Sequence, residues 1–148
     1  MARSLEQISD MMQQIDFCML VSRAQDGSLA GRPMSNNQQV AYEGTSYYFT
    51  SDDTRMVEDI GRDASVGLTY RTPTGADGQP GTFIHVEAEA RLVRDKNSFR
   101  EHWVPDLERW FQQGIDTPGL VLIEAQARRI HYWAGEDEGE VPLPGPTG

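Results

Sequence analysis

The chain has 148 residues, the length of a single domain that can bury a core without a disulfide or a metal. Its formal net charge of -10 argues against a general polyanion binder, and it has no basic stripe with interleaved aromatic residues. Its one cysteine, Cys18, lies in an apolar run, which excludes an internal disulfide framework. With no leader-like N-terminus and no apolar run of membrane-spanning length, we expect a cytoplasmic protein that binds neither nucleic acid nor membrane.

The first part of the chain predicts a helix followed by a β-hairpin. Residues 4–16 place apolar side chains at helical spacing and predict an amphipathic helix. Residues 17–24 predict a mostly apolar strand, and the Asp-Gly pair at 26–27 is a turn signal that leads into a return strand from Leu29. Because proline cannot donate to a strand ladder, Pro33 in this return strand indicates an edge, a bulge or a break.

The middle of the chain predicts a strand, a helix and a second strand. Residues 40–50 contain a Glu-Gly turn signal and then a strand from residue 45. The polar cluster at 52–54 can cap a helix. That helix has an apolar stripe formed by Met56, Val57 and Ile60. Residues 65–70 predict a short apolar strand, and residues 71–81, rich in glycine and proline, predict a loop.

The last strands are long. Residues 82–94 alternate apolar and polar side chains and give the clearest strand pattern of the chain. Residues 119–134 predict the final strand, with a bulge near Arg128 where the alternation is disturbed. The acidic, proline-rich residues 136–148 predict a disordered tail after a single domain at 1–135. Hairpin-linked strands with short peripheral helices favour a closed or partly closed antiparallel barrel over a parallel sheet.

Two arginines mark a candidate anion site. Arg32 and Arg55 flank the predicted junction between a strand and a capped helix, where Thr50, Ser51 and Thr54 supply hydroxyls. A helix N-terminus offers unpaired N–H groups and the positive end of a dipole, and arginine adds a planar fork of donors. Either arginine alone is more typical of a solvated surface. Together, beside the irregular proline-containing strand, they indicate a phosphate site.

Aromatic residues gather in a segment that separates the last two long strands. Residues 95–114 predict two short helices that carry Trp103, Trp110 and Phe111. Such side chains usually belong to a core or an interface. Because this segment is also rich in charge, the same residues would serve a flat ring ligand or the seam of a dimer.

Other kinds of site have weaker support. His85, His102 and His131 are isolated and follow no metal-ligand spacing, so we expect no metal site. Cys18 lies in an apolar strand, which disfavours a catalytic Cys–His pair. The chain has neither a Walker-type loop nor a dinucleotide glycine fingerprint, and we identify no general acid or base.

The order and spacing of several short pieces carry a resemblance. The sequence resembles the flavin-binding split-barrel group related to pyridoxamine 5′-phosphate oxidase, and within it the bacterial general stress proteins. The resemblance extends over about residues 5–134. The matching pieces are Phe17-Cys18-Met19-Leu20-Val21, Asp26-Gly27, Arg32-Pro33-Met34, Tyr48-Phe49-Thr50-Ser51, residues 86–92, residues 103–105, Trp110-Phe111, residues 114–118 and Tyr132-Trp133.

The resemblance implies a mainly β fold, a six-stranded antiparallel split β-barrel with peripheral helices, which forms a homodimer and binds FMN, with FAD as the alternative, at the dimer interface. It places Arg32, Pro33 and Met34 along the flavin ring, and Phe49, Thr50 and Ser51 at the ring and ribityl chain. Thr54 and Arg55 would hold the phosphate. Arg55 stands where many relatives carry lysine, which keeps the charge and changes the geometry. The partner subunit would supply Trp103, Trp110 or Phe111.

The function implied is that of a flavin-dependent oxidoreductase acting on an unknown small substrate. Pyridoxine phosphate oxidase activity itself is not expected, because the C-terminal arginine and histidine motif of those oxidases is replaced here by the acidic tail. Two alternatives remain at this point. One is a non-catalytic flavin binder that buffers or senses flavin during stress. The other is a binder of a different planar cofactor, such as haem or deazaflavin.

Overall fold

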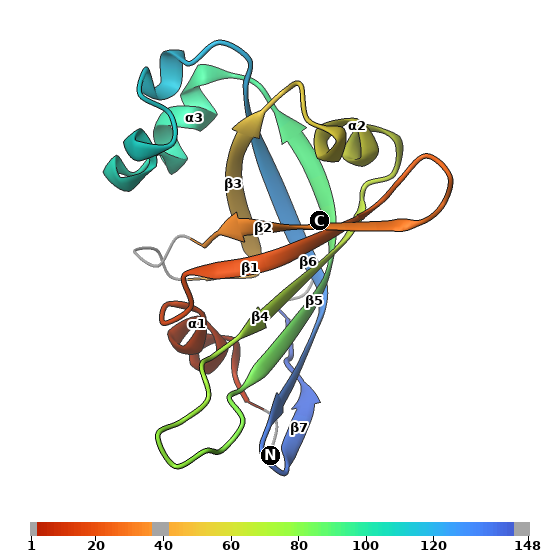
Figure 1. Ribbon diagram of the computed structural model, residues 1–148, viewed down its shortest axis with the longest axis vertical. Coiled ribbons are helices and arrows are strands. Elements are labelled where there is room, and N and C mark those ends of the chain that lie inside the picture. The colour runs from red at the N-terminus through yellow and green to blue at the C-terminus, as the bar shows by residue number, and fades with distance from the viewer. Residues whose placement is uncertain (1–2, 37–41, 144–148) are drawn as a thin grey trace.

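The computed structural model describes residues 3–36 and 42–143 (Figure 1). Its helices are α1 (Leu5–Met12), α2 (Arg55–Arg62), α3 (Lys96–His102) and the short 3₁₀ helices η1 (Pro105–Arg109) and η2 (Gly114–Asp116). Its strands are β1 (Phe17–Arg23), β2 (Leu29–Ser35), β3 (Thr45–Ser51), β4 (Ser65–Arg71), β5 (Phe83–Val93), β6 (Leu120–Ala134) and β7 (Asp137–Glu140).

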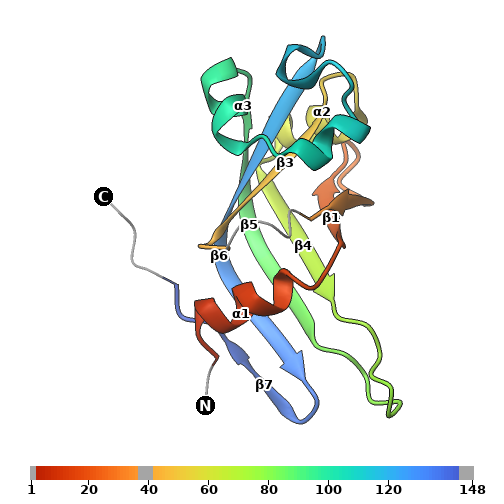
Figure 2. The ribbon, with the colours of Figure 1, turned by 90° about the vertical axis from the view of Figure 1, so that its left-hand side faces the viewer.

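One antiparallel sheet organises the molecule. Its strands follow the order β2-β1-β4-β5-β6-β3, and β7 adds to β6 beside this path. The twisted sheet curves on itself, with α2 and α3 near one end and α1 across the other (Figures 1 and 2). The predicted mainly β, antiparallel split barrel with peripheral helices is confirmed. Because β2 and β3 are the two ends of the path, the barrel is open between them.

The irregularities predicted in two strands have clear structural counterparts. Pro33 lies on the edge strand β2 and pairs in regular register with Met19, so the edge explains the proline and the strand is not broken. The bulge lies where predicted in β6. Glu87 pairs with Arg129 and Ala88 with Ala127, which leaves Arg128 as the additional residue.

Two expectations about the chain's ends need correction. The predicted disordered tail is wrong for residues 137–143, since 137–140 form β7 against β6 and Val141 is 4% exposed. Residues 144–148, like the predicted turn at Val40, lie outside the described residues. The first helix ends at Met12 and does not reach residue 16. There the Asn36 side-chain amide donates to the carbonyl oxygens of Met12 and Ile15, both at 2.8 Å, which satisfies groups left open by the helix end.

The core has two parts. The larger lies inside the barrel, where α1 contributes Ile8 and Met12 to a cluster of side chains from all the central strands. The smaller lies between the sheet and α3, around Phe49 and Phe99. Trp103 and Phe111, which follow α3, pack against this second cluster. The aromatic segment between β5 and β6 is therefore anchored on the β3–β6 side of the opening.

Candidate functional site

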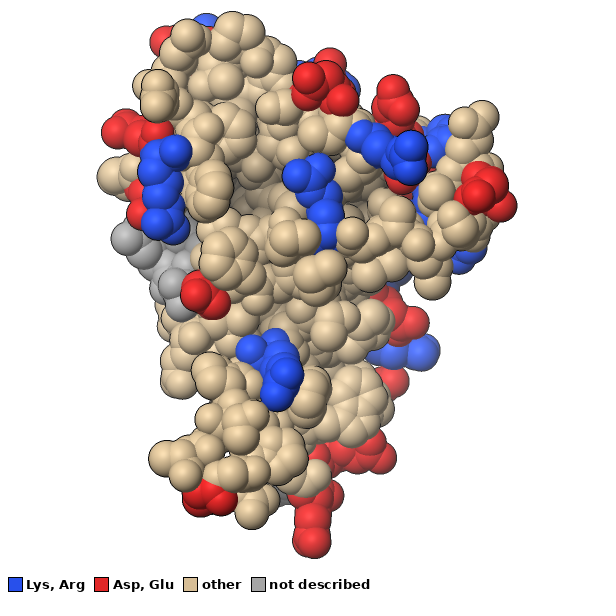
Figure 3. Space-filling view, viewed as in Figure 1, with Lys and Arg blue, Asp and Glu red and all other residues tan. Residues whose placement is uncertain are grey.

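A cavity of about 500 Å³ occupies the opening of the barrel. One wall is the edge strand β2 with Arg32, Pro33 and Met34, and the other is β3 from Tyr47 to Ser51. The segment from His102 to Phe111 closes a third side. Figure 3 shows a hollow in the surface with basic side chains beside it. The volume lies within the range of small-molecule sites, roughly 300–1,000 Å³.

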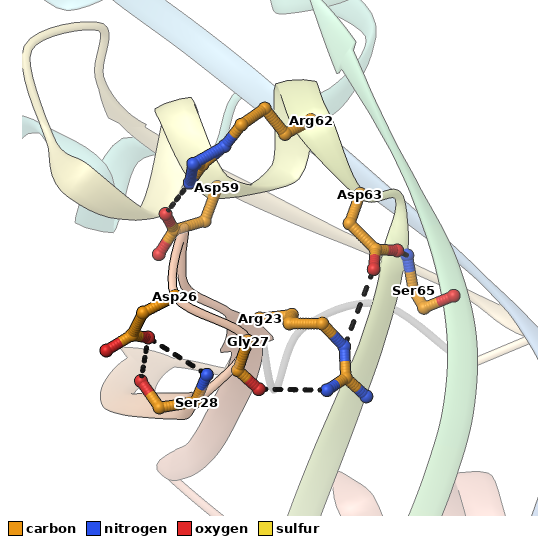
Figure 4. Close-up of polar contacts among 8 residues, drawn as sticks. All are labelled: Arg23, Asp26, Gly27, Ser28, Asp59, Arg62, Asp63 and Ser65. Carbon is orange, nitrogen blue, oxygen red and sulfur yellow. Dashed lines mark hydrogen bonds and ion pairs between the residues drawn. The ribbon is translucent and has the colours of Figure 1, made fainter.

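The charges at this end of the molecule are almost all neutralised. Arg23 donates to the Gly27 carbonyl at 3.0 Å and pairs with Asp63 at 3.5 Å, and Arg62 pairs with the buried Asp59 (Figure 4). These contacts join the β1–β2 hairpin to α2 and to the start of β4. The arginines that they involve have no capacity left for a ligand of the cavity.

Arg32 and Arg55 differ from every other basic residue that the structure describes. Each of the others forms a hydrogen bond or an ion pair within the protein. Arg32 and Arg55 form neither within the described part of the chain. Both are exposed, but only Arg32 lines the cavity. Arg32 is therefore a cation available to a bound anion.

Arg55 faces the hairpin more than the cavity. It acts on Asp26, whose pKa is lowered chiefly by hydrogen bonds from Ser28 and, in small part, by the charge of Arg55. The predicted phosphate contact of Arg55 is thus not brought to the cavity wall in this chain alone. The first turn of α2 does reach it, through Thr54, whose hydroxyl also accepts from the Val57 N–H at 3.2 Å as the helix cap.

The aromatic lining is fixed by ring packing. Phe49 meets Trp103 edge-on with ring centroids 5.0 Å apart, and Trp103 lies 6.2 Å from Phe111. Tyr47 stacks on His102. Trp110 is 56% exposed at the cavity margin, with Arg109 over its ring. The cavity therefore presents several aromatic surfaces, one of them open to the outside.

A buried polar network supports the β3 wall from behind. The Tyr48 hydroxyl lies 2.7 Å from the Tyr70 hydroxyl and 3.3 Å from Cys18 Sγ, and Ser46 Oγ lies 3.2 Å from the Tyr70 hydroxyl. Burial raises the pKa of Cys18 and of both tyrosines, so all three hold their protons. The network fixes the ring of Tyr48, which lines the cavity.

Most of the site residues predicted from sequence meet at this cavity. Its lining includes those from β2, β3 and the start of α2, together with two aromatic residues, namely Arg32, Pro33, Met34, Phe49, Thr50, Ser51, Thr54, Trp110 and Phe111. Arg55 and Trp103 are not in its lining; Trp103 instead supports Phe49 from below.

Sequence reasoning missed several lining residues, among them His102, Tyr47 and Asp106. His102 was dismissed because it follows no ligand spacing, yet it ends α3 directly over β3. Its position next to Trp103, in the same charged and aromatic segment, was the available signal. Asp106 begins η1 and pairs with Arg109 at 3.1 Å.

Comparison with known proteins identifies the family. The family described as pyridoxamine 5′-phosphate oxidase like matches residues 3–142. The chain belongs to this family. The match covers almost the whole described chain and includes the residues from both cavity walls. No curated protein matches the chain.

Solved structures of this oxidase-like family and of related folds agree with the architecture. A protein related to general stress protein 26 from Clostridium acetobutylicum has a TM-score of 0.78 at 15% identity, with 92% of each chain covered. General stress protein 26 of Bacillus anthracis has a TM-score of 0.70 at 20% identity, covering 91% of this chain and 96% of the other. A heme binding protein from Mycobacterium smegmatis has a TM-score of 0.75 at 12% identity, covering 95% and 58%. At these identities the likeness establishes the fold.

Two further observations concern metals and membranes. Within residues 3–36 and 42–143, no group of three or more histidine, cysteine or acidic side chains is arranged to hold a metal ion. No helix in the same ranges is long and apolar enough to cross a membrane.

Proposed function

We propose that this protein binds FMN in the cavity between β2 and β3 and serves as a flavin-dependent oxidoreductase for a small substrate. The observation that carries the proposal is the combination, in one cavity, of the unpartnered Arg32, the hydroxyls of Thr50 and Ser51, and aromatic rings. A phosphate needs the first two, and a flat ring needs the third.

The residues present fit FMN in size and in chemistry. Arg32 supplies charge for the phosphate, and the hydroxyls beside it supply hydrogen bonds for a polyol chain. Phe49 and Phe111 give an apolar surface for the ring, which a polar cavity would lack. Arg55, on the first turn of α2, would contribute a long-range attraction to the phosphate without lining the cavity.

Bound FMN would supply the electron or hydride transfer, while the protein supplies position, electrostatics and exclusion of water. The edge strand and β3 would hold the flavin from two sides. Asp59 and Asp63 neutralise the neighbouring arginines, so that Arg32 would dominate the local charge at the cavity. Since no lining residue presents itself as a general acid or base, a non-catalytic flavin binder remains the alternative within this proposal.

The proposal includes a homodimer that completes the site. The outer face of β1 and β2 carries exposed apolar side chains, including Phe17 at 48% and Met19 at 43% exposure. Phe17 and Pro33 belong both to this face and to the cavity lining. Figure 3 shows broad uncharged areas on the side drawn there. A second copy on this face would bury the apolar surface and cover the open side of the cavity.

The dimer can be tested by light scattering of the eluted protein. Met19→Lys places a charge in the apolar face and is expected to give monomers with weakened FMN binding. Gln79→Lys adds the same charge in the exposed 71–81 loop and should leave the dimer intact. Tight FMN binding by a demonstrated monomer would show that the site is not shared.

The flavin itself is tested by the absorption spectrum and the mass of whatever co-purifies, and by titration of cofactor-depleted protein with FMN and riboflavin. Bound flavin that no nicotinamide donor or other reductant reduces would favour the non-catalytic alternative. Protein that binds neither FMN nor riboflavin would remove the proposal.

Haem is the second candidate, because His102 lines the cavity and imidazole is a common iron ligand. The structural likeness to a heme binding protein is a likeness of fold alone. A visible spectrum after addition of hemin or FMN separates the two cofactors, since each has its own absorption bands.

A further inference from the structure

A second, smaller cavity of about 260 Å³ adjoins the first. The two share Asn36, Tyr47, Tyr48, His102 and Val104 in their linings. The stacked rings of Tyr47 and His102 thus stand at the boundary between them. Beyond this boundary the smaller cavity has its own lining, from α1, β3 and the end of α3. None of the residues assigned to the flavin from sequence belongs to it, except Trp103.

The smaller cavity has an unused polar group. Tyr42 lines it and is 9% exposed, and its hydroxyl is buried without a hydrogen-bond partner. The backbone of this residue is held in place, because the Tyr42 N–H donates to Ser9 Oγ at 2.7 Å. A buried hydroxyl without a partner is costly, so one that persists beside a cavity indicates a ligand that supplies the partner.

The charge of the smaller cavity is opposite to that of the larger. Among the described residues, Glu101 is the carboxylate in its lining, and no lysine or arginine lines it. The larger cavity instead presents the unpartnered Arg32. An anionic ligand would thus meet Glu101 without a compensating cation, whereas a cationic group would be attracted to it.

The size limits the ligand to a single ring. An apolar cavity of about 150 Å³ is known to hold benzene, so about 260 Å³ has room for one six-membered ring with a short side chain. Tyr47, Tyr48 and Trp103 provide aromatic surfaces for such a ring.

We propose that the smaller cavity binds a single-ring aromatic amine carrying a hydroxyl, with the hydroxyl partnered by Tyr42 and the ammonium group attracted by Glu101. As a ligand site this stands on the cavity's own residues. As a substrate site it rests on the proposed flavin function, since the molecule would then lie next to the ring, across the Tyr47–His102 pair.

The test uses small probes of one shape. Tyramine carries both groups, 4-hydroxyphenylacetate reverses the charge, and phenethylamine lacks the hydroxyl. Each is titrated into the full chain, with and without added FMN, and followed by quenching of tryptophan fluorescence and by calorimetry. Tyramine is expected to bind more tightly than either relative, by about threefold to tenfold in each comparison.

Two variants assign the preferences to residues. Tyr42→Phe should remove the preference for tyramine over phenethylamine and keep the preference over the acid. Glu101→Gln should do the reverse, by about fivefold or less because the carboxylate is exposed. Glu108→Gln is the matched control, since Glu108 is exposed nearby on η1 and lines neither cavity.

Equal binding of tyramine and 4-hydroxyphenylacetate, or a Glu101→Gln variant that behaves as Glu108→Gln does, would overturn the proposal. FMN binding, measured in the same samples by flavin absorbance, reports on the flavin proposal separately. Tyramine binding without FMN binding would leave the second site standing alone. FMN binding without any probe preference would remove the second site only.

Discussion

The imidazole ring of His102 lies flat on the ring of Tyr47, with centroids 3.7 Å apart and planes inclined by 16°. This contact joins the last residue of α3 to the strand β3 that forms one cavity wall. It therefore connects the segment that closes the opening to the sheet itself. It also places a nitrogen ligand at the border of a site where two kinds of cofactor have been considered.

Replacing His102 separates its two roles. His102→Ala removes the stacked pair and is expected to lower the free energy of unfolding by about 0.5–1.5 kcal/mol, as measured by urea denaturation. His102→Phe keeps a ring against Tyr47 and removes the imidazole nitrogens. If the cofactor is FMN, the phenylalanine variant should bind it nearly as the parent does. Loss of hemin binding in His102→Phe, with FMN never bound, would favour haem.

Removing Arg32 should weaken FMN much more than riboflavin, because the two ligands differ only in the phosphate. A hydrogen bond to a charged group contributes about 1.5–3 kcal/mol, so Arg32→Ala is expected to weaken FMN by roughly 10- to 100-fold. Arg55→Ala should have a smaller effect, since Arg55 does not line the cavity. The measurement is titration of cofactor-depleted protein by flavin fluorescence.

Arg100→Ala serves as the control for this pair, because Arg100 is exposed on α3 and bonds only to Asn97 at 2.9 Å among the described residues. Equal losses of FMN and riboflavin affinity in Arg32→Ala would mean that Arg32 contacts the ring and leaves the phosphate to other groups.

The sequence predicts the sheet well because burial on one face leaves a two-residue period. Residues 82–94 alternate for that reason and form β5, and the disturbed alternation near Arg128 corresponds to the bulge in β6. It does not predict β7, because residues 137–140 are almost all acidic and resemble a solvated tail. Backbone pairing with β6 and the burial of Val141 decide the matter.

The candidate site is harder to predict than the fold. The pair Arg32 and Arg55 stands out in the sequence, but which of them faces the cavity depends on how α2 sits over the β1–β2 hairpin. That packing is set by contacts such as Arg23 with Asp63, which join residues far apart in the chain. The contribution of His102 depends on the fold in the same way.

Two tyrosine-to-phenylalanine changes in the core are expected to have opposite effects. Tyr48→Phe removes a hydroxyl that bonds to Tyr70 at 2.7 Å and contacts Cys18, so it should lower the free energy of unfolding by about 1–3 kcal/mol. Tyr42→Phe removes a buried hydroxyl that has no partner, so stability should be unchanged or raised. Urea denaturation of both variants at neutral pH makes the comparison. Similar losses in both would mean that the Tyr42 hydroxyl is paired in solution.

The Cys18 thiol should make the protein less stable at alkaline pH. Burial raises the pKa of Cys18 above its usual value of 9.0, and hydrogen bonds with Tyr48 and Tyr70 offset part of the rise. As the pH passes 9.0, the unfolded chain releases the thiol proton and the folded chain retains it. The unfolded state then binds fewer protons, so the free energy of unfolding falls with rising pH, by at most about 1.4 kcal/mol per pH unit for one group.

The comparison is between the parent and Cys18→Ala, followed by urea denaturation from pH 7.5 to pH 10. Cys18→Ala should be less stable at neutral pH, because it leaves a small cavity, but its stability should fall less steeply above pH 9. The window stops near pH 10 because the buried Tyr48 and Tyr70, whose pKa values are also raised above 10.0, add the same kind of loss beyond it. Parallel stability curves for the two proteins between pH 9 and 10 would show that the thiol ionises equally readily in the folded and unfolded states. The barrel interior would then be more open to water around Cys18 than its 3% exposure indicates.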